Sequence, residues 1–184
     1  MNIDPILYRG RPEGSRSELE TKCYDFLDSL GVEYFRADHE HADTIEICHQ
    51  VEKVLLCGIC KNLLLTNRHL TEVYLLLMPG DKPFKSKLLS KQIGTARLSF
   101  ASAEQMMEKL SLTPGSVSVL GLLNDREKSV HLIIDRDLLK EEYFGCHPCV
   151  NSSTLKFKTA DLITKLLPAL GYEPQLVELP WETD

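Results

Sequence analysis

Two closely spaced apolar runs restrict the fold of this chain more than any other feature of its sequence. Residues 63–66 and 73–78 are almost continuously apolar, and residues 67–72 between them are polar. Runs of this kind are typical of strands that are covered on both faces, and the polar residues between them predict a hairpin connection. The sequence therefore predicts a central sheet with helices packed around it, which is a mixed α/β fold.

Cap signals and apolar periodicity place the remaining elements. Ser17 with Glu20, and Ser102 with Gln105, each form a capping-box pattern at the start of a helical repeat. Pro168 falls inside the last helical pattern and predicts a bend there. Helices are predicted over residues 17–30, 44–56, 82–91, 102–110 and 159–170, and strands over residues 32–37, 63–66, 73–78, 98–100, 129–135, 153–157 and 175–179.

Length and composition predict one globular domain behind a short extended arm. The chain has 184 residues, of which 43% are hydrophobic and 26% are charged, and such a chain can bury one core. Residues 1–16 lack periodicity, so we expect an arm there and a single domain over residues 17–184. We find no signal-peptide pattern and no apolar run as long as a membrane span, so we expect a cytoplasmic protein without membrane contact.

The charge of the chain is unlike that of a general nucleic-acid coat. Its formal net charge is −6, whereas such coats carry a basic excess. The basic side chains concentrate at Lys82, Lys85, Lys87 and Lys91. These lysines could contact phosphates, although a lysine run of this kind is more often a solvated helix face.

Two short segments concentrate the reactive side chains. Residues 57–62 and 144–151 each combine a C-x-x-C motif with polar neighbours. The cysteines are Cys57, Cys60, Cys146 and Cys149, and the polar neighbours include Lys61, Asn62 and His147. Either the four thiols form a metal or redox site, or the polar side chains form a pocket for a small substrate.

The positions of the cysteines weaken the redox interpretation. Neither motif starts a predicted helix, where the helix dipole would stabilise a thiolate. A zinc site made of four thiolates stays open, and so does the simple burial of the thiols as small hydrophobic side chains. A further candidate is the loop 113–118, because its backbone N–H groups could bind a carbonyl or phosphate oxygen, although a plain connecting loop has the same composition.

Five ordered segments of the sequence resemble the YbaK/ProRS-associated editing-domain family. They are residues 61–65, 96–102, 114–118, 120–125 and 145–151. Within this family the chain is most similar to the free-standing alanyl-tRNA(Pro) deacylases. The resemblance implies a mixed α/β fold with a central, partly barrel-like sheet. It also implies a trans-editing enzyme that hydrolyses the ester of mischarged aminoacyl-tRNA, Ala-tRNA(Pro) in particular.

The same resemblance implies the residues of the site. The implied catalytic residues are Lys61, Asn62 and His147. The implied substrate-binding residues are His39, Thr44, Gly115, Ser116, Val117, Ser118, Gly145 and Asn151. Val119 stands where the family usually has a proline, so the path of the preceding loop stays open. With tRNA as the substrate, the four lysines of residues 82–91 become candidates for contacts to its phosphates.

The implied partner is the acceptor end of a mischarged tRNA, with prolyl-tRNA synthetase or an elongation factor as further expected partners. We expect no metal and no cofactor. Neither Cys146 nor Cys149 has an evident base beside it, so attack by a positioned water is the better mechanism. The backbone N–H groups of residues 115–117 would stabilise the carbonyl oxygen as it gains charge. The alternatives are a non-catalytic zinc or thiol protein and a non-catalytic protein that binds the tRNA end.

Overall fold

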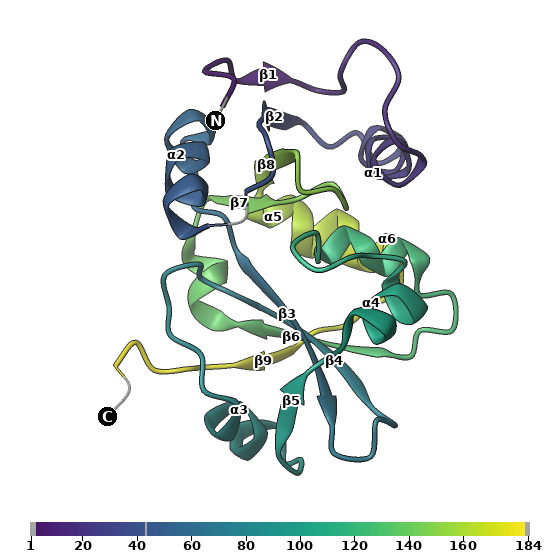
Figure 1. The fold of residues 1–184 in the computed structure, drawn as a ribbon, viewed down its shortest axis with the longest axis vertical. Helices are drawn as coiled ribbons and strands as arrows, with labels where there is room; N and C mark the ends of the chain where they lie inside the picture. The colour runs from purple at the N-terminus through teal and green to yellow at the C-terminus, as the bar shows by residue number, and fades with distance from the viewer. Residues whose placement is uncertain (1–2, 43, 183–184) are drawn as a thin grey trace.

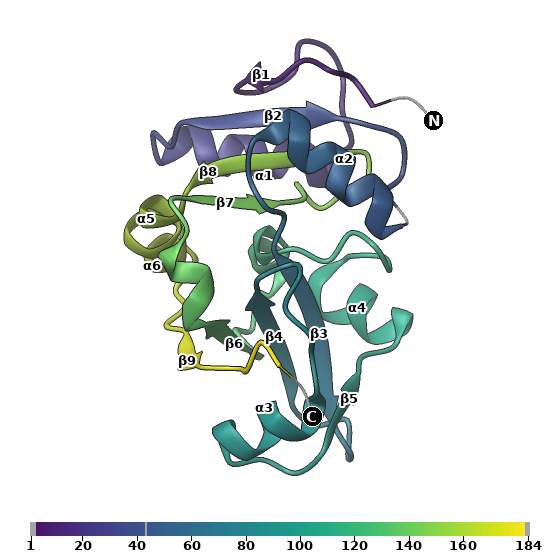
Figure 2. The same ribbon diagram turned by 90° about the vertical axis from the view of Figure 1, so that its left-hand side faces the viewer.

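The computed structural model describes residues 3–42 and 44–182, and its strands form two sheets (Figures 1 and 2). The larger sheet has the strand order β5-β3-β4-β6-β9. Its strands are β3 (Lys61–Asn67), β4 (Val73–Met78), β5 (Leu98–Phe100), β6 (Val130–Asp135) and β9 (Gln175–Val177). β3 pairs antiparallel with β4 and β5, whereas β6 pairs parallel with β4 and β9. The predicted mixed α/β fold is confirmed.

The smaller sheet has the order β1-β2-β8-β7, and all its neighbouring pairs are antiparallel. Its strands are β1 (Tyr8–Arg9), β2 (Tyr34–Asp38), β7 (Tyr143–Cys146) and β8 (Ser153–Lys158). The strands expected in one central sheet are thus divided between two, and neither closes into a barrel. The predicted arm supplies β1 at the edge of the smaller sheet, while its residues 1–2 lie outside the described part. The division into an arm and one domain stays a prediction.

β4 lies between two hydrophobic cores. Leu75 and Leu77 belong to the larger core, which β7 and β8 of the smaller sheet also line, and Leu76 and Met78 belong to a smaller core on the opposite face. All four side chains are fully buried. Side chains alternate across a strand, so a strand covered on both faces needs apolar residues at every position. This is why residues 73–78 form a continuous apolar run.

Helices cover the sheets near the predicted positions. They are α1 (Glu18–Ser29), α2 (Ile45–Leu55), α3 (Ser86–Ile93) and α4 (Ala103–Leu110), with 3₁₀ turns η1 (Val119–Asn124) and η2 (Arg136–Lys140). The last helical segment consists of α5 (Thr159–Asp161), a π-helical turn η3 (Leu162–Leu166) and α6 (Leu167–Leu170). The π-turn ends two residues before Pro168, which has no N–H to donate, and it marks the predicted irregularity. Within residues 3–42 and 44–182, no helix is long and apolar enough to cross a membrane.

The two predicted capping boxes differ in the structure. At α4 the box is complete, because the Ser102 hydroxyl accepts from the Gln105 N–H and the Gln105 side chain accepts from the Ser102 N–H. At α1 the Ser17 hydroxyl accepts from the Glu20 N–H at 3.2 Å, but the Glu20 carboxylate accepts instead from the Tyr24 hydroxyl at 2.6 Å. The second box is therefore only half formed, since a buried tyrosine competes for the carboxylate.

The two sheets meet where the chain enters β3. Ile59 forms an isolated parallel bridge with Gly145, and the Cys60 N–H donates to the Gly145 carbonyl oxygen at 2.9 Å. A Cβ atom on Gly145 would lie 2.6 Å from the Gly58 carbonyl oxygen, and one on Gly80 would lie 2.4 Å from the Ile59 carbonyl oxygen. Two glycines therefore allow this segment to pass between β7 and the end of β4.

The close approach predicts that Gly145→Ala destabilises the protein. Its methyl group would overlap the backbone of Gly58, and overpacking of this kind typically costs about 1–3 kcal/mol of unfolding free energy. Urea denaturation followed by circular dichroism measures the change. Gly58→Ala is the matched control, because the nearest atom to its added Cβ lies 4.0 Å away. Equal stability of the two variants would show that the glycine contact does not hold the sheets together.

Candidate active site

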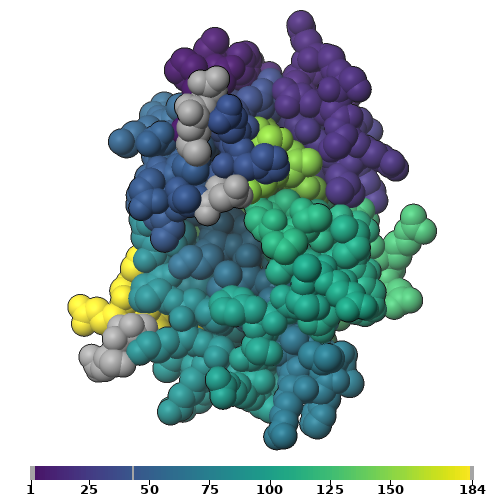
Figure 3. Space-filling view, viewed as in Figure 1, coloured from purple at the N-terminus to yellow at the C-terminus, as the bar shows by residue number. Residues whose placement is uncertain are grey.

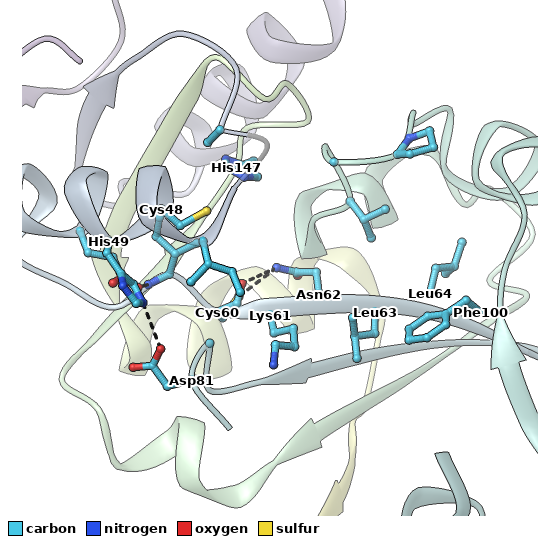
Figure 4. A pocket seen from close by; sticks show the side chains of 18 of the residues that line it. Cys48, His49, Cys60, Lys61, Asn62, Leu63, Leu64, Asp81, Phe100 and His147 are labelled. Atoms are coloured by element: carbon cyan, nitrogen blue, oxygen red, sulfur yellow. Dashed lines mark hydrogen bonds and ion pairs between the residues drawn. The ribbon is translucent and has the colours of Figure 1, made fainter. Parts of the chain in front are cut away.

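A cavity of about 520 Å³ opens at the junction of the two sheets (Figures 3 and 4). Its walls come from α2, the first half of β3, the loop before η1 and the turn after β7. The lining residues are Ala42, Ile45, Cys48, His49, Glu52, Ile59, Cys60, Lys61, Asn62, Leu63, Leu64, Gly80, Asp81, Phe100, Met106, Pro114, Gly115, Val117 and His147. All three predicted catalytic residues thus line one cavity, although they come from distant parts of the sequence.

Lys61 and Asn62 are consecutive on β3, so their side chains point to opposite faces of the strand. Figure 4 shows the Asn62 amide on the side of His147 and the Lys61 ammonium group on the other side. The Lys61 Nζ donates to the Lys82 carbonyl oxygen at 2.7 Å. Burial lowers the pKa of Lys61, and the Asp81 carboxylate opposes this shift. The predicted convergence therefore applies to the cavity as a whole, while β3 separates the ammonium group from the imidazole.

Asn62 presents an unused hydrogen-bond acceptor. Its Nδ2 donates to the Cys60 carbonyl oxygen at 3.2 Å and lies 3.0 Å from the Cys60 Sγ. Its Oδ1 is buried and has no hydrogen-bond partner among residues 3–42 and 44–182. A buried acceptor without a partner costs about 1–3 kcal/mol, and such groups in a native protein call for an explanation. A donor supplied by a bound ligand would satisfy this oxygen.

His147 follows β7 and presents one ring nitrogen to the cavity. Its Nδ1 lies 2.9 Å from the Ser153 carbonyl oxygen and 3.2 Å from the Thr154 Oγ1. A carbonyl oxygen only accepts, so Nδ1 carries the hydrogen and Nε2 carries the lone pair. Burial lowers the pKa of His147, and the neighbouring His39 adds to this shift. His147 is therefore a neutral acceptor at neutral pH.

The loop before η1 offers backbone N–H groups. Gly115 adopts φ +88°, a conformation that favours glycine, and both Gly115 and Val117 line the cavity. Their N–H groups have no hydrogen-bond acceptor in the part of the chain that the structure describes. Ser116 and Ser118 do not line the cavity. The Ser116 hydroxyl donates to the Thr113 carbonyl oxygen at 2.8 Å, and the Ser118 hydroxyl accepts from the Leu120 N–H at 3.2 Å.

Val119 adopts a backbone conformation that the proline usual at this position in the family could also adopt. It is the first residue of η1, a helical position that proline occupies readily. The preceding Ser118 has φ −151° and ψ 152°, and this extended conformation is the one favoured before a proline. The geometry around this position is thus the same as a proline would select.

Four predicted substrate-binding residues support the cavity from behind instead of lining it. His39 is buried, with both ring nitrogens hydrogen-bonded inside the protein, and Thr44 caps α2 by accepting from the Ile47 N–H at 3.4 Å. Gly145 makes the sheet contact described above. The Asn151 Oδ1 accepts from the Ala42 N–H at 3.2 Å. A Cβ atom on Gly115 would meet the Asn151 Nδ2 at 3.1 Å, so this amide braces the cavity loop.

The four motif cysteines do not form a metal centre. Burial raises the pKa of the Cys60 thiol to about 12 and that of Cys57 to about 11, and it also raises that of Cys146. The Sγ of Cys149 lies 3.5 Å from the Sγ of Cys23 on α1, which is outside the two motifs. Across the described residues, no group of three or more His, Cys, Asp or Glu could hold a metal ion. Cys60, Cys146 and Cys149 are buried and Cys57 is half-buried, and the zinc alternative has no support in the geometry.

The prediction that Lys82 contacts phosphate is wrong. Lys82 precedes α3 and is 0% exposed. Its Nζ donates to Asp135 at 2.8 Å, to Asp137 at 2.7 Å and to the Leu179 carbonyl oxygen at 2.7 Å. The Lys82 ammonium group is therefore fully buried, and three acceptors inside the protein already use its hydrogens. It cannot reach a phosphate in solvent. Sequence spacing does not distinguish such a lysine from its exposed neighbours.

The other three lysines stay candidates for contacts to phosphate. Lys85, Lys87 and Lys91 are exposed on or next to α3. Lys87 and Lys91 also line a shallow surface pocket together with Arg97.

Sequence patterns did not predict the wall that α2 contributes to the cavity. Ile45, Cys48, His49 and Glu52 line the cavity, and His49 Nε2 lies 3.3 Å from Asp81 Oδ1 (Figure 4). These four positions follow the i, i+3, i+4, i+7 spacing of one helical face. That spacing could have identified the face, but only the tertiary structure shows that it borders a cavity.

Comparison with known proteins finds the same family that the five sequence segments resemble. The model of the aminoacyl-tRNA editing domain family matches residues 39–165. The prolyl-tRNA editing protein ProX of Acetoanaerobium sticklandii is 33% identical over 153 residues, which cover 83% of this chain and 93% of that protein. The prolyl-tRNA synthetase associated domain-containing protein 1 of Danio rerio is 32% identical over 154 residues, which cover 83% of this chain and 81% of that protein.

Among solved structures, one described as a candidate trans-editing enzyme for prolyl-tRNA synthetase has the same fold. It superposes with a TM-score of 0.67 at 16% identity, over 90% of this chain and 100% of that chain. The chain belongs to the aminoacyl-tRNA editing domain family, as its five sequence segments indicated. It is an aminoacyl-tRNA deacylase.

The structural role of Lys82 predicts a large stability effect. Lys82→Met leaves the buried Asp135 carboxylate without its partner, and removing one member of a buried ion pair typically costs about 3–5 kcal/mol. Thermal and urea unfolding measure the loss. Lys87→Met, at an exposed position of α3, should unfold like the wild type. A Lys82→Met variant of wild-type stability would contradict the assigned ion pair.

Proposed function

We propose that this deacylase acts in trans on Ala-tRNA(Pro) and thereby keeps proline codons accurate. The single observation that carries the proposal is the cavity that Lys61, Asn62 and His147 line together, in a chain 33% identical to a prolyl-tRNA editing protein. The partner is the acceptor end of the mischarged tRNA. Prolyl-tRNA synthetase or an elongation factor would deliver it, and the cytoplasm is the place where all of them meet.

The reaction is the attack of water on the aminoacyl ester. A C–O bond forms between the water and the carbonyl carbon, and the ester bond to the terminal ribose breaks as a proton passes to the ribose oxygen. The protonated thiols near the cavity favour direct hydrolysis over a covalent intermediate. The ribose hydroxyl next to the ester helps to place the water, so the substrate contributes to its own cleavage.

Each polar group of the cavity has a role in this reaction. The N–H groups of Gly115 and Val117 stabilise the carbonyl oxygen as it becomes negative. The lone pair on His147 Nε2 and the free Oδ1 of Asn62 accept hydrogen bonds from the ribose hydroxyl and the substrate ammonium group. Lys61, on the other face of β3, holds a phosphate of the terminal nucleotides.

Exposed basic groups next to α3 extend the contact to the tRNA backbone. Lys87, Lys91 and Arg97 are exposed, and Lys85 lies just before the helix. Phosphate contacts of this kind position a nucleic acid without reading its sequence. They would let an acidic protein bind the acceptor stem through a local patch.

Size selects the amino acid. A synthetase site that accepts proline discriminates against a smaller side chain by only about 1–3 kcal/mol per methylene, so errors pass. A second site that admits alanine and excludes proline removes these errors. Val117, which lines the cavity in the loop beside His147, narrows the space available for the side chain.

The first test is deacylation of Ala-tRNA(Pro) by the purified protein. Lys61→Ala should lower kcat/KM by roughly 10- to 150-fold, which corresponds to the about 1.5–3 kcal/mol that a hydrogen bond to a charged group contributes. Lys53→Ala, on the exposed side of α2, is the control and should cleave at the wild-type rate. Binding of the tRNA without any cleavage by the wild type would favour a non-catalytic tRNA-end binder.

The second test concerns selectivity. Val117→Ala enlarges the cavity and should raise the rate on Pro-tRNA(Pro) relative to Ala-tRNA(Pro) by roughly 10- to 200-fold. Val119→Ala removes the same atoms from a side chain that is buried outside the cavity, so its selectivity should be that of the wild type. An unchanged ratio of the two rates in Val117→Ala would show that another residue limits the size of the side chain.

A further inference from the structure

Hydrogen bonds behind the cavity connect the loop before α2 with His147 through His39 and Thr154. His39 Nδ1 lies 2.7 Å from the Glu40 carbonyl oxygen, and His39 Nε2 lies 2.8 Å from the Thr154 Oγ1. The same hydroxyl lies 3.2 Å from His147 Nδ1. The two imidazole rings are 6.1 Å apart between centroids. His39 does not line the cavity, so it reaches the site only through Thr154.

The donor and the acceptor of each of these hydrogen bonds follow from the Glu40 carbonyl oxygen, which can only accept. The Glu40 carbonyl oxygen only accepts, so His39 Nδ1 carries a hydrogen. Burial lowers the pKa of His39, so its ring is neutral and Nε2 carries a lone pair. The Thr154 hydroxyl therefore donates its one hydrogen to His39. Having no other hydrogen, it can only accept from His147 Nδ1.

We infer that His39 is a positioning residue, which holds the hydroxyl hydrogen of Thr154 and thereby keeps His147 in the tautomer with a hydrogen on Nδ1 and a lone pair on Nε2. The inference rests on the proposed function for the role of His147, and it replaces the substrate contact that the family resemblance implied for His39. Thr154 is the link, because its hydroxyl touches both rings.

The contribution of His39 adds to that of the Ser153 carbonyl oxygen. Ser153 alone favours a hydrogen on His147 Nδ1. A free Thr154 hydroxyl, however, could rotate and donate to Nδ1, which would stabilise the other tautomer with its hydrogen on Nε2. That tautomer cannot accept a hydrogen bond from the substrate. His39 closes this alternative, because it accepts the only hydrogen that Thr154 can donate.

The direct test is the tautomer of His147 in the free protein. Heteronuclear NMR of ¹⁵N-histidine-labelled protein distinguishes a protonated from an unprotonated ring nitrogen, and loss of the signals in His147→Asn assigns them. The wild type should show a protonated Nδ1 and an unprotonated Nε2. His39→Leu should shift a measurable fraction of His147 to the opposite tautomer. His39→Gln, whose amide oxygen can still accept from Thr154, should restore the wild-type pattern.

A double variant separates positioning from damage to the fold. In His39→Leu/Thr154→Val no hydroxyl is left to donate to His147, so Ser153 should again impose the wild-type tautomer. Loss of fold would instead leave both variants disturbed. His41→Leu is the matched control, because His41 is exposed two residues along the chain, and it should change nothing. An unchanged tautomer in folded His39→Leu would overturn the inference.

Kinetics give the second readout. His39→Leu should lower kcat on Ala-tRNA(Pro) roughly 10- to 100-fold, the range found when the partner that orients a functional histidine is removed. KM should stay the same, because His39 does not touch the substrate, and a rise in KM with unchanged kcat would instead support a substrate contact. If the wild type does not cleave this tRNA, the proposed function fails, while the NMR measurement still decides the role of His39.

Discussion

The site depends on one close contact between two stretches of backbone. The chain that enters β3 passes so near Gly145 that no side chain fits between them, and Gly80 allows the same approach from the other side. This contact sets the beginning of β3 beside the end of β7. The cavity lies at that junction, so Asn62 and His147 line the same cavity although they are 85 positions apart along the chain. Rigid strands on both sides then hold the polar groups in place.

The electrostatics of the cavity suit the positioning of a neutral water. Burial lowers the pKa of His147 and raises that of Cys146, so this imidazole is uncharged and this thiol is protonated at neutral pH. On the His147 side of β3 the groups assigned to the reaction are two N–H groups of the loop, an amide oxygen and an imidazole lone pair, while Lys61, Glu52, His49 and Asp81 line other parts of the cavity. The strongly paired charges lie elsewhere, around the buried Lys82 and Asp135, where they hold β6 against the end of the chain.

Local sequence pattern predicted the structure correctly where a single helix or strand determined it. The apolar run at residues 73–78 predicted a doubly covered strand, and the cap at Ser102 predicted the start of α4. Local pattern gave the wrong prediction where the outcome depended on how the side chains pack. Glu20 turns to Tyr24 instead of completing a capping box, and Lys82 turns inward to Asp135 instead of joining the exposed lysines. Tyr24 is only four residues from Glu20, but its burial in the core brings its hydroxyl to the carboxylate, whereas Asp135 lies 53 residues from Lys82 along the chain.

By itself the sequence determined the mixed α/β class, the elements that carry the polar residues and, through five ordered segments, the editing family. Only the tertiary structure decided how these residues act, because direction and burial are properties of the packed chain. It put the amine of Lys61 and the amide of Asn62 on opposite faces of β3. It also buried His39 outside the cavity, where the Thr154 hydroxyl links it to His147. Strand alternation follows from local geometry, but which face meets a cavity depends on residues far away in the chain.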